Sequence, residues 1–185
     1  MKAGVLAVQG DFREHALMFA ECGATPVLVR TPAELGSVAC LSIPGGESTA
    51  IGRLLVRYDL VEPIRQAAAG GMPIYGTCAG MIVMARTVHD GEPLLSLLDV
   101  AVRRNAYGRQ SESFEADVDV KGIGDVRAVF IRAPRVEGIG PDVEVLAEHE
   151  GDPVVVRQMT RLASTFHPEI AGDARLHELL LSMTG

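Results

Sequence analysis

The chain has 185 residues, of which 48% are hydrophobic, 22% charged and 4% aromatic, and its net charge is −7 with a pI near 5.2. This acidic, aromatic-poor composition disfavours a nucleic-acid-binding surface, and no apolar run approaches the roughly 18 residues of a membrane span. Three cysteines without zinc-ligand spacing, and an N-terminal apolar stretch too short for a secretory signal, predict a reducing, cytoplasmic location and one domain over residues 1–185.

Strand-like apolar runs alternate with helical patterns through the first half of the chain. Thr31, Pro32 and Glu34 have the spacing of a capping box at a helix start. The alternation predicts an α/β fold with a mostly parallel central sheet and helices on both faces. Strands are predicted at 3–8, 25–29, 39–43 and 72–76, and helices at 12–21, from 31, and at 48–57, 60–69 and 79–87.

From about residue 99 the pattern changes to short alternating strands separated by Gly, Pro and charged residues. The last segment, Asp173 to Met183, is predicted to form a helix with Asp173 as its N-cap. The strands expected in this half are 99–104, 114–120, 125–131, 143–151, 153–158 and 162–167.

Cys78 lies in the sequence GTCAG at the end of the fourth predicted strand, where ligands bind in open α/β sheets. Gly76 and Gly80, with small residues between them, permit the sharp strand-to-helix turn that exposes a nucleophile. The sulfur would also lie at a helix N-terminus, whose partial positive charge favours a thiolate. For an isolated cysteine the alternative is a small apolar residue that fills a gap, but the glycine context favours a nucleophile.

A partner for Cys78 follows the last predicted strand, in the sequence STFHPE. His167 can accept and return protons near neutral pH. Glu169 projects to the same side if the segment is extended, so its carboxylate can orient the imidazole. By itself the segment is more typical of a surface turn, but its place after an apolar strand, in a chain with Cys78, favours the catalytic interpretation.

The glycine-rich segment PGGEST, residues 44–49, follows the third predicted strand. Consecutive backbone N–H groups in such a loop can bind a phosphate or supply half of an oxyanion hole. A phosphate loop requires a following lysine, which this segment lacks. The N–H groups of Gly46 and Ala79 are therefore predicted to form an oxyanion hole, with a plain glycine-rich turn as the alternative.

The other candidate side chains carry weaker signals. Cys22 and Cys40 fall in apolar patterns and are predicted to be core residues. The polar segment QGDFREH, residues 9–15, can border the site or an interface, and RRNAYGRQ, residues 103–110, is either a solvated loop or a binding segment for a substrate carboxylate. Four histidines have no ligand spacing and are predicted to be surface or helix-face residues: His15, His89, His149 and His177.

Together, these motifs resemble those of the triad-type, class I glutamine amidotransferases. The resemblance is sharpest with the glutaminase subunits of pyridoxal 5′-phosphate synthase. GTCAG or HPE alone would indicate only the superfamily, whereas the joint set is highly specific. The matching segments are AVQGDFREH, PGGEST, GTCAGM, RRNAYGRQSESFEAD, FIRAP and STFHPE, in this order, from residue 7 to residue 169.

The resemblance implies a flavodoxin-like fold and the hydrolysis of L-glutamine to L-glutamate and ammonia through a γ-glutamyl thioester, without a metal or an organic cofactor. It carries over Cys78 as the nucleophile, with His167 and Glu169 as its catalytic partners. The residues that it implies to contact glutamine are Gly46, Glu47, Ser48, Arg104, Ile131 and Arg132.

The resemblance also implies a partner, a separate barrel-shaped synthase subunit, with up to twelve copies of each subunit in the assembly. That partner would use the ammonia with ribose 5-phosphate and glyceraldehyde 3-phosphate to make pyridoxal 5′-phosphate, the vitamin B6 cofactor. Two alternatives remain. A free-standing cysteine peptidase or amidase on the same fold would need no partner, and a non-catalytic regulator of a synthase would have no reactive thiol.

Overall fold

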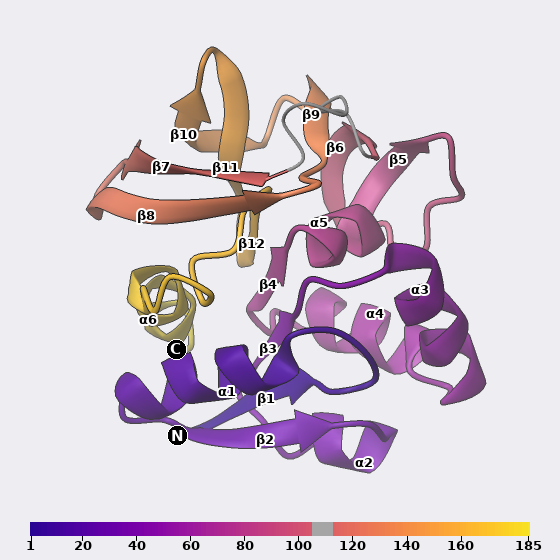
Figure 1. The fold of residues 1–185 in the computed structure, drawn as a ribbon. Helices are drawn as coiled ribbons and strands as arrows, with labels where there is room; N and C mark the ends of the chain where they lie inside the picture. The colour runs from indigo at the N-terminus through magenta and orange to yellow at the C-terminus, as the bar shows by residue number, and fades with distance from the viewer. Residues whose placement is uncertain (105–112) are drawn as a thin grey trace.

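The structure is a computed structural model that describes residues 1–104 and 113–185. Strands and helices alternate in the N-terminal half, as predicted (Figure 1). The predicted capping box at Thr31 is confirmed, because its hydroxyl accepts a hydrogen bond from the Glu34 N–H while the Glu34 carboxylate accepts one from the Thr31 N–H. The elements are β1 (Lys2–Leu6), α1 (Phe12–Glu21), β2 (Thr25–Val29), α2 (Pro32–Leu35), β3 (Cys40–Ile43), α3 (Ser48–Arg57), α4 (Val61–Ala69), β4 (Ile74–Thr77) and α5 (Ala79–Met84).

The second half of the described chain is dominated by strands and ends in one helix, as the sequence predicts. Its elements are β5 (Ala85–His89), β6 (Leu98–Arg103), β7 (Ser113–Val120), β8 (Gly124–Ile131), β9 (Arg135–Ile139), β10 (Glu144–His149), β11 (Asp152–Gln158), β12 (Arg161–Ser164) and α6 (Arg175–Ser182).

The sequence analysis was wrong about several elements. Residues 85–87, predicted to be helical, belong to β5, because this segment pairs with β6. Both β5 and β9 were missed, and β12 ends at Ser164 instead of His167. Helix α6 begins at Arg175, with Ala174 at the N-cap position and no side-chain cap. The Asp173 carboxylate accepts instead from the backbone N–H and the guanidinium of Arg175.

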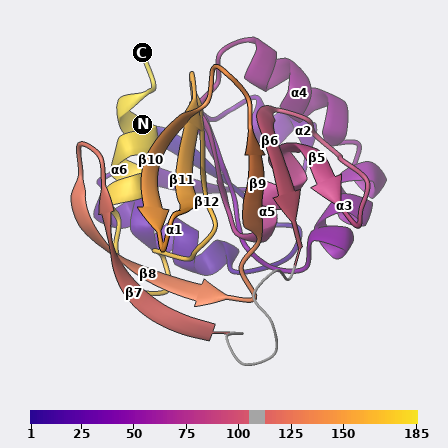
Figure 2. The same ribbon diagram turned by 90° about the horizontal axis from the view of Figure 1, so that it is seen from above.

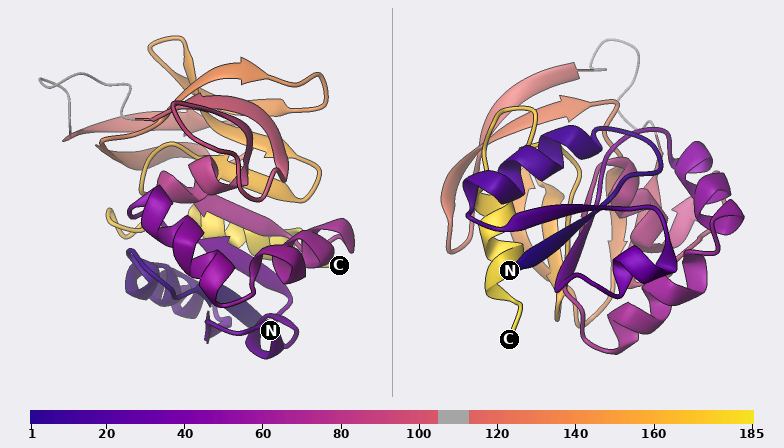
Figure 3. Two further views of the ribbon diagram at one scale, coloured as in Figure 1. Left: turned by 90° about the vertical axis from the view of Figure 1, so that its right-hand side faces the viewer. Right: turned by 90° about the horizontal axis from the view of Figure 1, so that it is seen from below.

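The central sheet has seven strands in the order β10-β11-β12-β4-β3-β1-β2. The five strands from β12 to β2 are parallel, while β10 and β11 extend the sheet in antiparallel fashion. Alternate side chains of a strand point to opposite faces. Tyr75 of β4 thus packs in a cluster with Phe19 of α1, whereas Ile74 packs in another with Leu55 of α3. Helices α1 and α6 cover one face and α3, α4 and α5 the other (Figures 1 and 3), which confirms the predicted architecture.

The remaining strands form a layer above the carboxyl-end edge of the parallel strands. A three-stranded sheet, β5-β6-β9, and the β7-β8 hairpin make up this layer (Figure 2). The His167 N–H donates to the carbonyl of Val129 in β8 at 2.9 Å, and Phe130 packs against Phe166 with ring centroids 5.4 Å apart. These contacts bring the end of β8 next to the segment that follows β12.

Of the two cysteines predicted to be core residues, the prediction is confirmed for Cys40 and wrong for Cys22. Cys40 is fully buried in β3, whereas Cys22, which follows the end of α1, is only partly buried. Burial raises the pKa of each thiol to about 11, with nearby carboxylates adding to the effect at Cys22. No helix in residues 1–104 or 113–185 is long and apolar enough to cross a membrane.

The close approach of α5 to β3 generates a stability prediction. A Cβ added at Gly80 would lie 2.0 Å from the backbone carbonyl oxygen of Ile43, so we expect Gly80→Ala to lower the free energy of unfolding by about 1–3 kcal/mol. In α3, the one described atom within 4 Å of a Cβ at Gly52 would be Leu94 Cδ2, at 3.5 Å. Gly52→Ala should therefore stabilise the protein by about 0.5–1 kcal/mol. Urea unfolding of both variants and of the wild-type protein measures these free energies. A Gly80→Ala protein that is as stable as the wild-type protein would contradict the prediction.

Candidate active site

The site lies where three neighbouring parallel strands end. Strand β4 is paired with β3 on one side, with Ile43 opposite Gly76, and with β12 on the other, with Ser164 opposite Thr77. Because parallel strands have their carboxyl ends at the same edge, the segments that follow them meet there. This pairing brings together Cys78, the Gly45–Gly46 loop and His167, which are far apart in the sequence.

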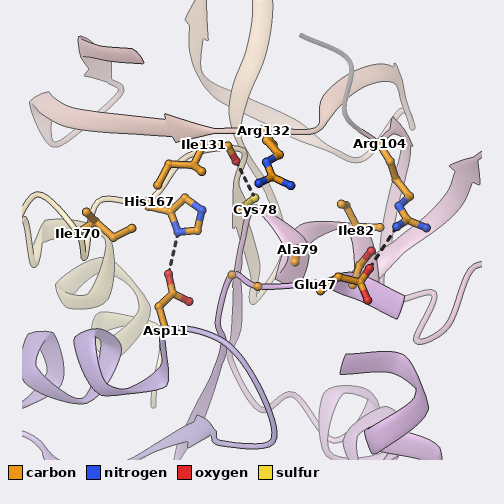
Figure 4. A pocket seen from close by; sticks show the side chains of 13 residues that line it. Asp11, Glu47, Cys78, Ala79, Ile82, Arg104, Ile131, Arg132, His167 and Ile170 are labelled. Carbon is orange, nitrogen blue, oxygen red and sulfur yellow. Dashed lines mark hydrogen bonds and ion pairs between the residues drawn. The ribbon is translucent and has the colours of Figure 1, made fainter. Parts of the chain in front are cut away.

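Cys78 has a strained backbone between β4 and α5. Its φ of 47° and ψ of −103° lie outside the regions that non-glycine residues usually occupy. The turn is held by the Cys78 N–H, which donates to the Ser164 carbonyl at 2.8 Å. A Cβ at Gly76 would lie 2.7 Å from atoms of Gly80 and Met84, so the turn requires a glycine there. The Cys78 side chain is 7% exposed and lines a pocket (Figure 4). This is the local geometry of a nucleophile elbow.

The imidazole of His167 is buried between Cys78 and two carboxylates. Its Nδ1 lies 2.7 Å from Glu169 Oε1 and 2.9 Å from Asp11 Oδ2. Cys78 lines the same pocket as the ring, and its Sγ lies 3.8 Å from the carbonyl oxygen of Ile131 (Figure 4). Burial opposes protonation, but the contacts with Asp11, Cys78 and Glu169 outweigh it and raise the pKa of His167 to about 12. The ring is therefore an imidazolium whose Nδ1–H faces two acceptors.

Glu169 lies behind His167 and does not line the pocket. It is 3% exposed, and burial alone would raise its pKa. The imidazoles of His15 and His167 outweigh burial and hold that pKa well below its usual value. Glu169 is therefore a carboxylate, as an acceptor for the His167 Nδ1–H must be.

Two of the four histidines without ligand spacing lie on helix faces, as one of the two predicted settings has it. His15 of α1 and His177 of α6 are both fully buried there. They contact each other, with His177 Nε2 2.8 Å from His15 Nδ1, and His15 Nε2 lies 3.6 Å from Glu169 Oε1. Their positions are 162 apart in the chain, so no local spacing indicated the pair.

The pocket has a volume of about 480 Å³ and collects nearly all of the predicted site residues. Glu47 caps α3 by accepting from the N–H groups of Thr49 and Ala50, and these bonds outweigh burial and hold its pKa below the usual value. Its carboxylate also lies 3.3 Å from Arg104 Nη2 (Figure 4). The predicted residues that line the pocket are Gly46, Glu47, Ser48, Cys78, Ala79, Arg104, Ile131, Arg132 and His167.

The glycine loop lies against the predicted catalytic residues with no room for side chains. A Cβ at Gly45 would lie 2.1 Å from His167 Cε1, and one at Gly46 would lie 2.4 Å from Gln9 Oε1. Gly46 also has a φ of +150°, and the Glu47 N–H donates to Gln9 Oε1 at 2.9 Å. Gly46 and Ala79 both border the pocket beside Cys78, and their role as an oxyanion hole stays a prediction.

Asp11 contacts His167 in the pocket but was not assigned individually by the sequence analysis, and neither were Ile82 and Ile170, which also line the pocket. Asp11 belongs to QGDFREH, the segment expected to border the site, and its N–H donates to the Gly45 carbonyl at 3.3 Å. Among the described residues, Asp11, His167 and Glu169 are the one group whose potential metal-ligand atoms lie close together, within 4.8 Å. The oxygens of Asp11 and Glu169 already contact His167 Nδ1. We therefore assign the two carboxylates to binding the proton on this nitrogen and not to binding a metal ion. RRNAYGRQ lies outside the described residues after Arg104.

The contact of Asp11 with His167 generates a prediction about protonation. Replacing one carboxylate with a neutral amide weakens the preference for the imidazolium, so Asp11→Asn should lower the pKa of His167 by about 1–3 units. An NMR titration of the imidazole nitrogens checks this, and Asp142→Asn in an exposed turn is the control. Unchanged titration of His167 in Asp11→Asn would show that Glu169 suffices to keep it protonated.

Comparison with known proteins identifies the family of the chain. The SNO glutamine amidotransferase family matches residues 5–184. A protein from Desulforudis audaxviator named pyridoxal 5′-phosphate synthase subunit PdxT is 52% identical over 98% of this chain and 97% of its own length. A protein of the same name from Frankia alni is 54% identical over 98% of this chain and 94% of its own length.

Solved structures show the same fold. A crystal structure of a glutamine amidotransferase has a TM-score of 0.95 at 45% identity and covers 99% of this chain and 98% of its own. A putative GMP synthase component from Thermoplasma acidophilum has a TM-score of 0.72 at 15% identity and covers 100% of this chain and 94% of its own, a likeness that concerns the fold alone. These neighbours confirm the predicted glutamine amidotransferase fold. The chain belongs to the SNO glutamine amidotransferase family.

Proposed function

We propose that the chain hydrolyses L-glutamine to L-glutamate and ammonia and passes the ammonia to a synthase subunit that makes pyridoxal 5′-phosphate. The observation that carries the proposal is that Cys78 and His167 line one pocket while Glu169 Oε1 lies 2.7 Å from His167 Nδ1 behind it, in a chain that belongs to a glutamine amidotransferase family. No metal or organic cofactor has a step in this reaction.

The pocket offers groups of both signs for an amino-acid substrate. Arg104 and Arg132 line it and are suited to pair with the α-carboxylate, while the Glu47 carboxylate at its rim is suited to the α-ammonium group. Backbone groups of Gly46, together with Ser48 and Ile131, complete the proposed glutamine contacts. The side-chain amide would then point toward Cys78.

The proposed reaction begins with attack of the Cys78 thiolate on the side-chain amide carbon of glutamine. The N–H groups of Gly46 and Ala79 stabilise the oxyanion, and each such donor is typically worth about 10²–10³ in rate. The His167 imidazolium gives its proton to the leaving nitrogen, so that the C–N bond breaks and ammonia departs. The product of this step is a γ-glutamyl thioester on Cys78.

Hydrolysis of the thioester restores the enzyme. Neutral His167 takes a proton from water, whose oxygen adds to the thioester carbonyl, and breaking of the C–S bond then releases glutamate and the Cys78 thiolate. His167 is again an imidazolium between Glu169 and Asp11. The two carboxylates stabilise the charged form of the ring, to which it returns after each proton transfer.

The relatives named as subunits of pyridoxal 5′-phosphate synthase support a partner for this chain. We propose that residues 1–185 act as one glutaminase domain in the cytoplasm, bound to a barrel-shaped synthase subunit with up to twelve copies of each. The synthase would combine the ammonia with ribose 5-phosphate and glyceraldehyde 3-phosphate. Protonation in bulk water would make ammonia a poor nucleophile, so direct transfer between the subunits suits the chemistry.

Replacing Cys78 tests the nucleophile. Cys78→Ala should abolish glutamate release from L-glutamine, measured with and without the synthase subunit, while leaving the fold and synthase binding intact. Wild-type protein should release more glutamate when the synthase subunit is present. Full activity of Cys78→Ala would overturn the assignment. If wild-type protein is equally and highly active with and without the synthase subunit, the result would favour a free-standing amidase. If it binds the synthase subunit but shows no activity, the result would favour a regulatory subunit.

Glu169 should matter less than Cys78, because it orients His167 without forming a bond to the substrate. We expect Glu169→Gln to retain measurable glutaminase activity under conditions in which Cys78→Ala has none. The measurement is kcat for each variant together with its thermal unfolding midpoint. Complete loss in both variants, with a lowered midpoint for Glu169→Gln, would show that Glu169 is needed to hold the fold together.

A further inference from the structure

A buried pair of histidines lies behind Glu169 and has no step in the proposed reaction. His15 of α1 and His177 of α6 have no exposed surface, and the two helices lie side by side on one face of the sheet (Figures 1 and 3). His177 Nε2 is 2.8 Å from His15 Nδ1. His15 Nε2 is 3.1 Å from Thr77 Oγ1 and 3.6 Å from Glu169 Oε1.

The surroundings of His177 determine which nitrogens carry protons. Burial is the largest cause that lowers the pKa of His177, to about 3, so the ring is neutral and has a single N–H. Its Nδ1 is buried without a hydrogen-bond partner among the described residues, and a buried donor without a partner is rarer than a buried acceptor without one. The proton therefore lies on Nε2, which donates to His15 Nδ1.

This tautomer of His177 also determines what His15 presents to the site. With Nδ1 accepting, His15 has its proton on Nε2, which donates to Thr77 Oγ1 and faces the Glu169 carboxylate. The opposite tautomer would direct a lone pair at a carboxylate that is already negative. Thr77 directly precedes Cys78, so the same His15 nitrogen contacts the strand end that supports the proposed nucleophile.

The Glu169 carboxylate depends on this arrangement for its orientation. Oε1 is the oxygen that both imidazoles approach, at 2.7 Å from His167 and 3.6 Å from His15. The other oxygen, Oε2, is buried and has no hydrogen-bond partner in residues 1–104 or 113–185. Since none of these residues holds Oε2 by a hydrogen bond, rotation of the carboxylate is limited mainly by the two imidazoles at Oε1.

We propose that His15, held in one tautomer by His177, is a positioning residue that aims Glu169 Oε1 at the Nδ1–H of His167. This inference rests on the proposed function for its effect on rate, but the arrangement itself is a property of the resting protein. If His15 only filled space in the core, an apolar side chain of similar size would serve as well, since buried polar groups are costly without partners. The two roles predict different results for two substitutions of His15.

The test compares His15→Leu with His15→Gln in complex with the synthase subunit. Leucine keeps the bulk and removes the N–H. The base itself stays in place, so kcat for glutamine hydrolysis should fall by about 10- to 100-fold, which is less than the roughly 10²–10⁴-fold that general acid–base catalysis typically supplies. KM should stay unchanged, because the pocket residues are untouched. Glutamine can return an N–H to a similar place, so His15→Gln should recover most of the lost activity.

A spectroscopic measurement separates positioning from loss of stability. The proton NMR signal of the His167 Nδ1–H should shift in His15→Leu and return toward its wild-type position in His15→Gln. Ile64→Ala is the control, because Ile64 is buried in α4 in the other core cluster. That variant should have a lower thermal midpoint with unchanged kcat and an unchanged signal.

The proposal is overturned if His15→Leu keeps both wild-type kcat and the wild-type His167 signal. It is also overturned if both His15 variants lose activity only in proportion to their thermal midpoints, as a core residue would. The NMR signal needs no substrate. A wild-type protein without glutaminase activity would therefore overturn the proposed function, while the His167 signal would still decide the role of His15.

Discussion

The active-site geometry depends on the parallel pairing of β4 with β3 and β12. The register pairs Gly76 with Ile43 and Thr77 with Ser164. As a result, the turn at Cys78, the Gly45–Gly46 loop and the segment with His167 all begin at the same edge of the sheet. A slip of one residue in this register would exchange the two faces of the strand and direct Cys78 away from the pocket. The helices on both faces bury the sheet and make such a slip costly.

The register brings ionisable groups together in a place that is largely shielded from water. An isolated buried charge costs several kcal/mol, and Asp11, Glu169 and His167 offset this cost for one another through contacts of 2.7 and 2.9 Å at one nitrogen. The segments that supply these groups follow β1 and β12 in the sheet. Formation of the sheet therefore also brings the two carboxylates to His167, and their contacts stabilise the charged form of its imidazole.

Close packing at the site is accompanied by backbone strain at Cys78, the proposed nucleophile. A non-glycine residue at the φ of 47° observed for Cys78 is typically strained by about 1–3 kcal/mol. The surrounding contacts maintain the strain, since Gly80 lets α5 touch β3 and Gly45 lets the loop touch His167. Glycine is needed at these positions because backbone or imidazole atoms occupy the space that a Cβ would take.

The sequence by itself determined the alternation of strands and helices, the capping box at Thr31 and the segments that line the pocket, because these depend on periodicity and on short motifs. Only the tertiary structure placed Asp11 on His167, 156 positions away, joined His15 to His177, and set Glu169 behind the pocket. It also formed β5 and β9, whose pairing partners decide their conformation. Contacts between distant segments follow from strand register and helix packing, and local residue patterns contain no information about either.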